Sequence, residues 1–245
     1  VGLLLLQYIL NNKKDIPANG KVITTVVSTP MIDVVAPAKN VGVIKTLTGF
    51  KYIGEKIRQF ENKEIDGTYI LGFEESYGYL IGTHARDKDA IVSSLLIAEM
   101  AAFYNSKGTS IYKELQKLYQ EFGYYLEGIK SVTLTGKDGI EKMANLMTEL
   151  RETVKDRTID KNIKIKRDFK TKKELIVATG EEKDILLPVE NVIQFVLEDD
   201  TYITARPSGT ETKIKFYFSV NAPTKEEVEK KLNETMEKFV ATLKL

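Results

Sequence analysis

One eight-residue segment concentrates groups that bind anions. Arg206–Lys213 reads Arg-Pro-Ser-Gly-Thr-Glu-Thr-Lys and combines a guanidinium, an ammonium and three hydroxyl groups. Gly209 at its centre can adopt a positive φ, which would curl consecutive N–H groups into a concave donor nest. Arg also matches the bidentate geometry of a phosphate or a carboxylate. The segment therefore predicts a phosphate-binding loop, and the alternative is a basic hairpin turn without a ligand.

A second segment carries groups that suit a sugar. Gly72–Gly78 sets two carboxylates and a hydroxyl between glycines. Carboxylates accept hydrogen bonds and hydroxyls both donate and accept, so Glu74 and Ser76 could pair with sugar hydroxyls. The alternative is a solvated turn. Further along, His84 is the single His of the chain and could transfer protons, although a lone His is more often structural.

The bulk composition describes an ordinary globular protein. Of its 245 residues, 42% are hydrophobic and 29% are charged. The 36 basic and 35 acidic residues nearly cancel, so nothing indicates binding to nucleic acid or to a membrane surface by bulk charge. The absence of Cys excludes disulfides, thiolate zinc sites and Cys nucleophiles, and we expect a cytoplasmic protein.

The first half of the chain alternates strand and helix patterns. This order predicts a three-layer, doubly wound α/β domain with a mostly parallel sheet, in which ligands gather at the carboxyl ends of strands. Thr29 is expected to cap a helix that begins at Pro30. Asp89 is expected to cap a nearly all-apolar helix over 90–104, which should be buried on all sides. The strands are expected at 22–27, 41–46 and 68–71, so the loops at 28–29, 46–51 and 72–78 should converge.

The pattern changes near Gly123–Glu127. Strands then predominate, and the last one alternates apolar and polar residues from Ile214 to Val220. Thr224 and Glu227 form a capping box for a final helix. We therefore expect a smaller α+β domain with an antiparallel sheet flanked by helices, and domains at 1–124 and 125–245. The elements expected here are strands at 128–134, 192–197, 202–205 and 214–220 and a helix at 137–151.

Four motifs give the chain a family resemblance. Gly72–Gly78, Arg86–Asp89 and Arg206–Glu211, in this order, resemble the α-D-phosphohexomutases, and bacterial phosphoglucomutase/phosphomannomutase in particular. Thr48–Tyr52 is similar to a loop of that family's third domain. The resemblance implies the third and fourth of four domains, that is, a C-terminal part that begins after the family's phosphoserine loop and magnesium loop. The apolar start at Val1 is accordingly interpreted as a cut in a larger protein rather than a signal peptide.

The resemblance also implies an activity and a set of roles. The parent would interconvert glucose 1-phosphate and glucose 6-phosphate through a hexose 1,6-bisphosphate, with Mg²⁺ bound outside this chain. No residue here is a certain catalytic residue, and Lys88 and His84 are the candidates. Sugar-binding roles would fall to Thr48, Gly49, Glu74 and Ser76. The non-reacting phosphate would be bound by Arg206, Ser208, Gly209, Thr210 and Lys213.

The sequence departs from the family pattern at one position and leaves alternatives open. Thr212 stands where many relatives have Pro, which loosens the phosphate loop without removing it. The Glu-Glu-Ser order at Glu74–Ser76 resembles the glucose branch of the family, and mannose or glucosamine phosphate is the alternative substrate. A phospho-ligand-binding module without catalysis is the alternative from another class. The sequence does not reveal the oligomeric state, and a hexose phosphate is the only partner that it implies.

Overall fold

The chain folds into two compact units. A computed structural model describes residues 1–136, 138–152, 157–158 and 161–243. The units are Val1–Gly123 and Tyr124–Leu245, so the boundary lies one residue before the expected one and the units are nearly equal in length. Each unit has its own sheet. Within the described residues, no helix is both long enough and apolar enough to span a bilayer.

The sheet of the first unit is mostly parallel. Its order is β2 (Gly42–Thr46), β1 (Gly20–Thr25), β3 (Thr68–Phe73) and β4 (Tyr79–Ile81). Strand β1 runs parallel to both β2 and β3, which confirms the three expected strands. Strand β4 is antiparallel to β3 and was not predicted. With three residues it is too short to show an alternating pattern.

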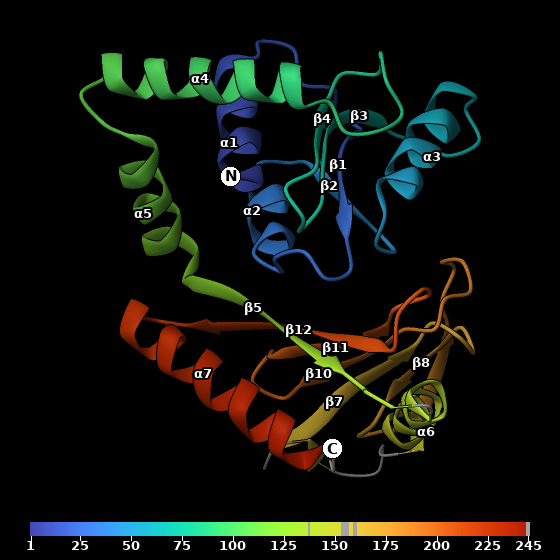
Figure 1. The fold of residues 1–245 in the computed structure, drawn as a ribbon. Helices are drawn as coiled ribbons and strands as arrows, with labels where there is room; N and C mark the ends of the chain where they lie inside the picture. Colours follow the sequence, from blue (N-terminus) through green and yellow to red (C-terminus); the bar gives the residue numbers. More distant parts are fainter. Residues whose placement is uncertain (137, 153–156, 159–160, 244–245) are drawn as a thin grey trace. The chain divides into compact units, whose positions relative to one another are not determined.

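Helices cover both faces of this sheet. The helices of the unit are α1 (Gly2–Asn12), α2 (Ile32–Ala38), α3 (Phe50–Glu61), α4 (Ala90–Ser106) and α5 (Ile111–Phe122), of which α5 packs against α1 and α4. Helix α3 lies on one face and α1 and α2 on the other, so the unit is a three-layer doubly wound domain (Figure 1). The expected start of α2 at Pro30 is wrong. The Thr29 hydroxyl accepts a bond from the Met31 N–H at 3.4 Å in a preceding turn, and the helix begins two residues later.

Helix α4 departs from the expectation of burial on all sides. Its predicted cap is confirmed, because the Asp89 carboxylate accepts bonds from the N–H groups of Ile91 and Val92 at 2.9 and 3.0 Å. However, the side chains of Ile91 and Leu95 are 83% and 68% exposed. The helix packs along one side against α1 and β4, and its buried residues are Ser93, Met100 and Tyr104. An apolar composition thus shows that a helix can be buried and not that each side is covered.

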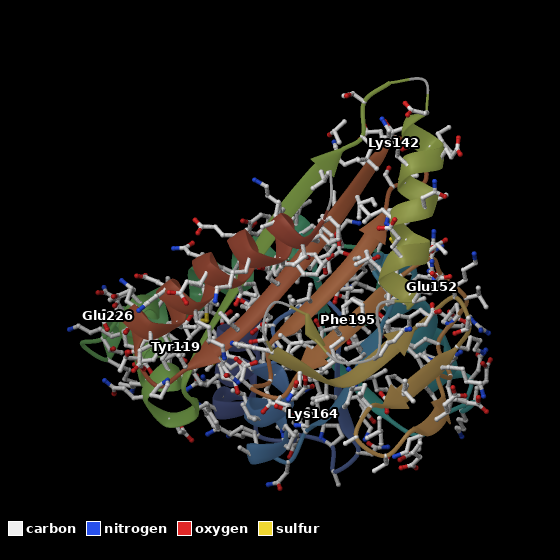
Figure 2. The ribbon with its side chains drawn as sticks, turned by 90° about the horizontal axis from the view of Figure 1, so that it is seen from below. Tyr119, Lys142, Glu152, Lys164, Phe195 and Glu226 are labelled. Carbon is white, nitrogen blue, oxygen red and sulfur yellow. The ribbon has the colours of Figure 1, made fainter. Side chains whose placement is uncertain are left out.

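The second unit is an antiparallel sheet with helices on one face. Its strands run in the order β5 (Tyr124–Thr133), β12 (Lys213–Ala222), β11 (Tyr202–Pro207), β10 (Ile193–Leu197), β7 (Lys161–Asp168), β8 (Lys173–Ile176) and β9 (Glu181–Asp184), with β6 (Arg157–Thr158) paired to β7. Helices α6 (Gly139–Glu152) and α7 (Lys225–Thr242) lie across one face, with Phe195 of β10 in the sheet behind them (Figure 2).

The core of this unit forms between that face and the two helices. Phe195, Phe216 and Phe218 of the sheet are almost fully buried, and Phe239 of α7 packs edge-on against the last two. The four predicted strands and the Thr224 cap are confirmed, since the Thr224 hydroxyl accepts from the Glu227 N–H at 3.2 Å. Strands β7 to β9 were not assigned from the Lys-rich sequence. The predicted start of α6 at Lys137 lies outside the described residues.

Candidate functional site

Loops of the first unit meet at the carboxyl edge of its sheet. Strand β1 ends at Thr25, whose hydroxyl donates a hydrogen bond to Glu75 Oε2 at 2.6 Å in the segment after β3. The backbone N–H of Val26 donates to the carbonyl of Thr46, the last residue of β2, at 2.8 Å. The segments that follow β1, β2 and β3 therefore lie together, as the alternating pattern predicted.

The segment Glu74–Gly78 is the turn of a hairpin that joins β3 and β4. The Glu74 N–H donates to the Gly78 carbonyl at 2.9 Å, and Tyr77 adopts a positive φ of 62°. A Cβ atom on Gly78 would lie 2.7 Å from both Glu74 Oε1 and Lys88 Cδ. Gly78 thus leaves room for two predicted site residues, Glu74 and Lys88, to approach one another across the turn.

The Glu74 carboxylate is held in a partly desolvated position. Glu74 is 9% exposed. Burial is the main cause that raises the pKa of its carboxyl, and the negative charge of Glu75 raises this pKa further. The charge of Lys88 and a hydrogen bond from Ser76 act in the opposite direction. An acceptor in this position forms stronger hydrogen bonds than it would in water, because the surrounding dielectric is low.

Lys88 keeps its positive charge in this cluster. A hydrogen bond to Asp87, 2.9 Å from Nζ to Oδ1, is the main cause that raises the Lys88 pKa, and the charge of Glu74 contributes. The ammonium also lies 5.6 Å from the centre of the Phe50 ring, within cation–π distance. Phe50 begins α3 directly after Thr48 and Gly49, so Lys88 connects the Thr48–Gly49 loop to the hairpin turn. Thr48 is 8% exposed.

His84, the second candidate for a catalytic role, contacts Asp89 at the start of α4. Its Nε2 lies 2.7 Å from Asp89 Oδ2, and this contact is the main cause of the lowered pKa of Asp89. The Asp89 carboxylate is also the cap of α4. In the described part of the chain, no hydrogen bond joins His84 to Glu74 or to Lys88, so the structure associates His84 with the start of the helix.

The segment Arg206–Lys213 joins two adjacent strands of the second unit, β11 and β12, as predicted. Its base is closed by a hydrogen bond from the Ser208 N–H to the Lys213 carbonyl at 2.7 Å. The Ser208 hydroxyl oxygen accepts from the N–H groups of Thr210 and Glu211 at 3.3 and 3.2 Å. The Ser208 side chain therefore organises the turn from within, and its O–H remains able to donate to a ligand.

The expected backbone conformation of Gly209 is wrong. Its φ is not positive, and a Cβ atom added there would meet nothing within 4 Å. Consecutive N–H groups are therefore not gathered by a left-handed residue at this position. Instead, the Ser208 hydroxyl accepts the hydrogen bonds that shape the turn.

The cations of this loop differ in their partners. Lys213 Nζ lies 3.0 Å from Glu211 Oε2, so its charge is partly neutralised. Arg206 stands directly opposite Lys215 in the register of β11 and β12. Within the part of the chain that the structure describes, neither the Arg206 guanidinium nor the Lys215 ammonium forms a hydrogen bond or an ion pair. Like charges placed directly opposite one another destabilise a sheet, and a bound anion would relieve this repulsion.

Lys215 is a candidate that reasoning from the sequence missed. It lies two residues beyond Lys213, on the face of β12 opposite the buried Ile214 and Phe216. The alternating pattern of this strand was recognised and already placed Lys215 on the polar face. Side chains on one face of a strand recur every second residue, so Lys215 could have been found as the next residue after Lys213 on the same face.

A pair of glycine replacements distinguishes the two loops. Gly49 has a φ of 115°, so Gly49→Ala should lower the free energy of unfolding by about 1–3 kcal/mol through backbone strain. Gly209→Ala should leave this free energy within about 0.5 kcal/mol or raise it slightly, because the site is open and φ is ordinary. Urea unfolding of both variants measures the difference. A loss in Gly209→Ala as large as that in Gly49→Ala would contradict the loop geometry.

Comparisons with known proteins agree with the architecture. Residues 1–122 match the family described as phosphoglucomutase/phosphomannomutase, alpha/beta/alpha domain III. The chain is 32% identical over 228 residues to a phosphoglucomutase of Staphylococcus haemolyticus and 34% identical over 233 residues to one of Staphylococcus aureus. The chain belongs to the α-D-phosphohexomutase family. The two alignments cover 93% and 95% of this chain and 41% of each relative, so this phosphohexomutase chain spans about two fifths of the relatives' length.

Solved structures share the fold of this phosphohexomutase chain. The parafusin phosphoglucomutase of Paramecium superposes with a TM-score of 0.65 at 18% identity, over 99% of this chain and 41% of that one. A putative phosphomannomutase of Thermus thermophilus gives a TM-score of 0.54 at 17% identity, over 96% and 39% of the two chains. At these identities the likeness establishes the fold alone.

Proposed function

We propose that this chain is the hexose- and distal-phosphate-binding part of a phosphoglucomutase that interconverts glucose 1-phosphate and glucose 6-phosphate through a hexose 1,6-bisphosphate. Residues 1–124 would be the third domain of the parent, and residues 125–245 would be its fourth, C-terminal domain. The observation that carries the proposal is the pair of cations, Arg206 and Lys215, which form no ion pair among the described residues and lie beside a loop rich in hydroxyls. The charge of Lys215 also acts on Glu211 and helps to lower the pKa of that carboxyl.

The phosphate-binding loop would hold the end of the substrate that does not react. Arg206 and Lys215 supply charge, and Ser208 and Thr210 supply hydroxyl donors, while Gly209 lets the ligand approach the backbone and Lys213 adds a partly neutralised cation. A distal grip of this kind positions the reacting phosphate and allows the sugar to bind in two orientations. The loop would thus recognise phosphate without breaking a bond.

The hairpin of the first unit would recognise the sugar. The Glu74 carboxylate accepts from hexose hydroxyls, and Ser76 donates or accepts beside it, with Thr48 and Gly49 on the neighbouring loop. Lys88 would place positive charge near the transferring phosphoryl group. The Glu74 and Lys88 side chains both border Gly78, and each charge acts on the pKa of the other group, which supports a common site for these two residues.

Magnesium, which the family resemblance implies for the parent, does not fit the residues present. Among residues 1–136, 138–152, 157–158 and 161–243, no three His, Asp or Glu side chains gather as a metal site. We therefore place no step at a metal in this chain. We assign these residues to binding and orientation.

Glucose is the proposed hexose because the Glu74–Glu75–Ser76 order resembles the glucose branch, and because the relatives above carry the name phosphoglucomutase. Mannose or glucosamine phosphate remains the alternative within the family. A phospho-ligand-binding module without catalysis is the alternative from another class. The chain spans about 41% of its relatives, so the whole activity is assigned only to a longer parent.

Titration calorimetry and an activity assay on this chain test the proposal together. Glucose 1-phosphate should bind more tightly than inorganic phosphate, mannose 1-phosphate or glucosamine 1-phosphate, since both phosphate and sugar hydroxyls are recognised. With Mg²⁺ and glucose 1,6-bisphosphate present, the chain should produce no glucose 6-phosphate. Measurable turnover would show a nucleophile in these residues, and equal affinity for glucose 1-phosphate and inorganic phosphate would contradict sugar recognition.

A further inference from the structure

The two adjacent glutamates of the hairpin turn have different surroundings. Glu74 faces Lys88 across Gly78, whereas Glu75 accepts the hydroxyl proton of Thr25 at 2.6 Å. Thr25 is fully buried at the end of β1, which is the parallel neighbour of β3. The register pairs Thr24 with Phe73, so Thr25 stands level with the start of the turn. The Glu75 side chain thus binds the sheet rather than the face that carries Lys88.

A second hydroxyl extends this contact. Ser28 Oγ lies 3.0 Å from Thr25 Oγ1, and Ser28 is 5% exposed. A hydroxyl has a single proton to donate, and that of Thr25 goes to Glu75, so Ser28 must be the donor to Thr25. The Val27 N–H also donates to Thr25 Oγ1, at 3.4 Å. Each donor polarises the next, which strengthens the terminal bond to the carboxylate.

Beyond Glu74, which receives a hydrogen bond from Ser76, the outer part of the turn is exposed. Ser76 is exposed and the Tyr77 side chain is 87% exposed. The base of the turn carries the bond from the Glu74 N–H to the Gly78 carbonyl, and Glu75 carries the bond to β1. Glu74 and Ser76 flank Glu75 on both sides, so fixing Glu75 fixes the direction in which both of its neighbours point.

We propose that Glu75 is a positioning residue, which through Thr25 and Ser28 fastens the 74–78 turn to the end of β1 and so directs Glu74 and Ser76 toward the hydroxyl groups of a hexose. The inference deepens the proposed function and rests on it. It adds Glu75, Thr25 and Ser28 to the sugar site without giving any of them contact with the sugar.

Two replacements of Thr25 separate this role from simple packing. Thr25→Val keeps the branched shape and removes the hydroxyl, whereas Thr25→Ser keeps the hydroxyl and removes a methyl group. Thr25→Val should weaken binding of glucose 1-phosphate roughly 5- to 20-fold, a fraction of what a lost charged hydrogen bond costs directly. Thr25→Ser should stay within about twofold of the unmodified chain. The dissociation constant for inorganic phosphate should be unchanged in both, because the proposed phosphate loop lies in the other unit.

Hydrogen exchange provides a readout that needs no ligand. The Glu74 amide, which bonds to the Gly78 carbonyl, should exchange at least about tenfold faster in Thr25→Val and in Glu75→Ala than in the unmodified chain or in Thr25→Ser. Glu75→Gln should exchange at a rate between these, since its amide oxygen still accepts from Thr25 without a charge.

The outcomes distinguish this inference from the proposed function. If the unmodified chain fails to bind glucose 1-phosphate, the proposed function is wrong, and the assignment of the turn to a sugar site is wrong with it. If that chain binds and Thr25→Val binds equally well, the positioning role alone is overturned. Unchanged exchange of the Glu74 amide in Thr25→Val would overturn it as well, and weaker binding by Thr25→Ser than by Thr25→Val would assign Thr25 to packing.

Discussion

Replacing Arg206 with Ala should weaken the binding of inorganic phosphate and of glucose 1-phosphate to this chain by about 1.5–3 kcal/mol, the usual worth of a hydrogen bond that involves charge. The guanidinium has no ion pair in the described structure, so it is already available to a ligand. Titration calorimetry of both ligands measures the change. Both affinities should fall by a similar factor, because the loop binds the group that the two ligands share.

The fold itself should not suffer from this change. Removing Arg206 relieves its repulsion with Lys215 across β11 and β12, so the free energy of unfolding should stay constant or rise slightly. Arg58→Ala is the matched control, since Arg58 is an exposed Arg of α3 paired with Glu64 at 2.9 Å. The control should leave phosphate binding unchanged. If the dissociation constants of Arg206→Ala for inorganic phosphate and glucose 1-phosphate are unchanged, the loop is an ordinary basic turn and not a phosphate site.

Replacing Glu74 with Gln should have opposite effects on binding and on stability. Burial raises the pKa of the Glu74 carboxyl above its ordinary value of 4.5, so the folded chain holds this proton more firmly than the unfolded chain does. Stability therefore falls as the pH rises from 4.5 through the raised pKa, and the loss persists at neutral pH. Glu74→Gln removes this loss, so the free energy of unfolding at pH 7 should rise relative to the unmodified chain.

Binding of the sugar should change in the other direction. A neutral amide is a weaker hydrogen-bond acceptor than a carboxylate. Glu74→Gln should therefore lose at least about 1.5 kcal/mol of binding free energy for glucose 1-phosphate, while its affinity for inorganic phosphate stays the same. Glu55→Gln, on the exposed side of α3, is the matched control and should change neither quantity. If Glu74→Gln is less stable than the unmodified chain at pH 7, the carboxylate is held by favourable contacts rather than desolvated. An unchanged affinity for glucose 1-phosphate would remove Glu74 from the site.

Most of the architecture was predictable because local patterns and chain direction agree. The β-branched run at 22–27 and the alternation from Ile214 to Val220 mark strands by themselves. The order of strands and helices then requires a parallel sheet in the first unit, whose carboxyl edge brings Thr25 close to Glu75. The loop Arg206–Lys213 could be placed because strand patterns stand directly before and after it, at 202–205 and 214–220.

The rest depended on contacts that sequence does not encode locally. Strand β4 exists because it pairs with β3, and its three residues carry no pattern of their own. The exposure of Ile91 and Leu95 depends on which helices happen to lie against α4. Gly209 has no positive φ, and the Ser208 hydroxyl accepts the hydrogen bonds inside this turn, from the N–H groups of Thr210 and Glu211. In each case tertiary context decided between conformations that the residue type allowed.

The antiparallel pairing of Arg206 with Lys215 imposes a parity rule on the chain. Side chains alternate faces along β12, so one residue inserted between Lys213 and Ile214 would turn Lys215 into the helix-covered core and bring Ile214 to the polar face. A change of two residues would restore both orientations. The tip of the loop can therefore vary in length during evolution more freely than the strand at its base, where length is constrained to even steps.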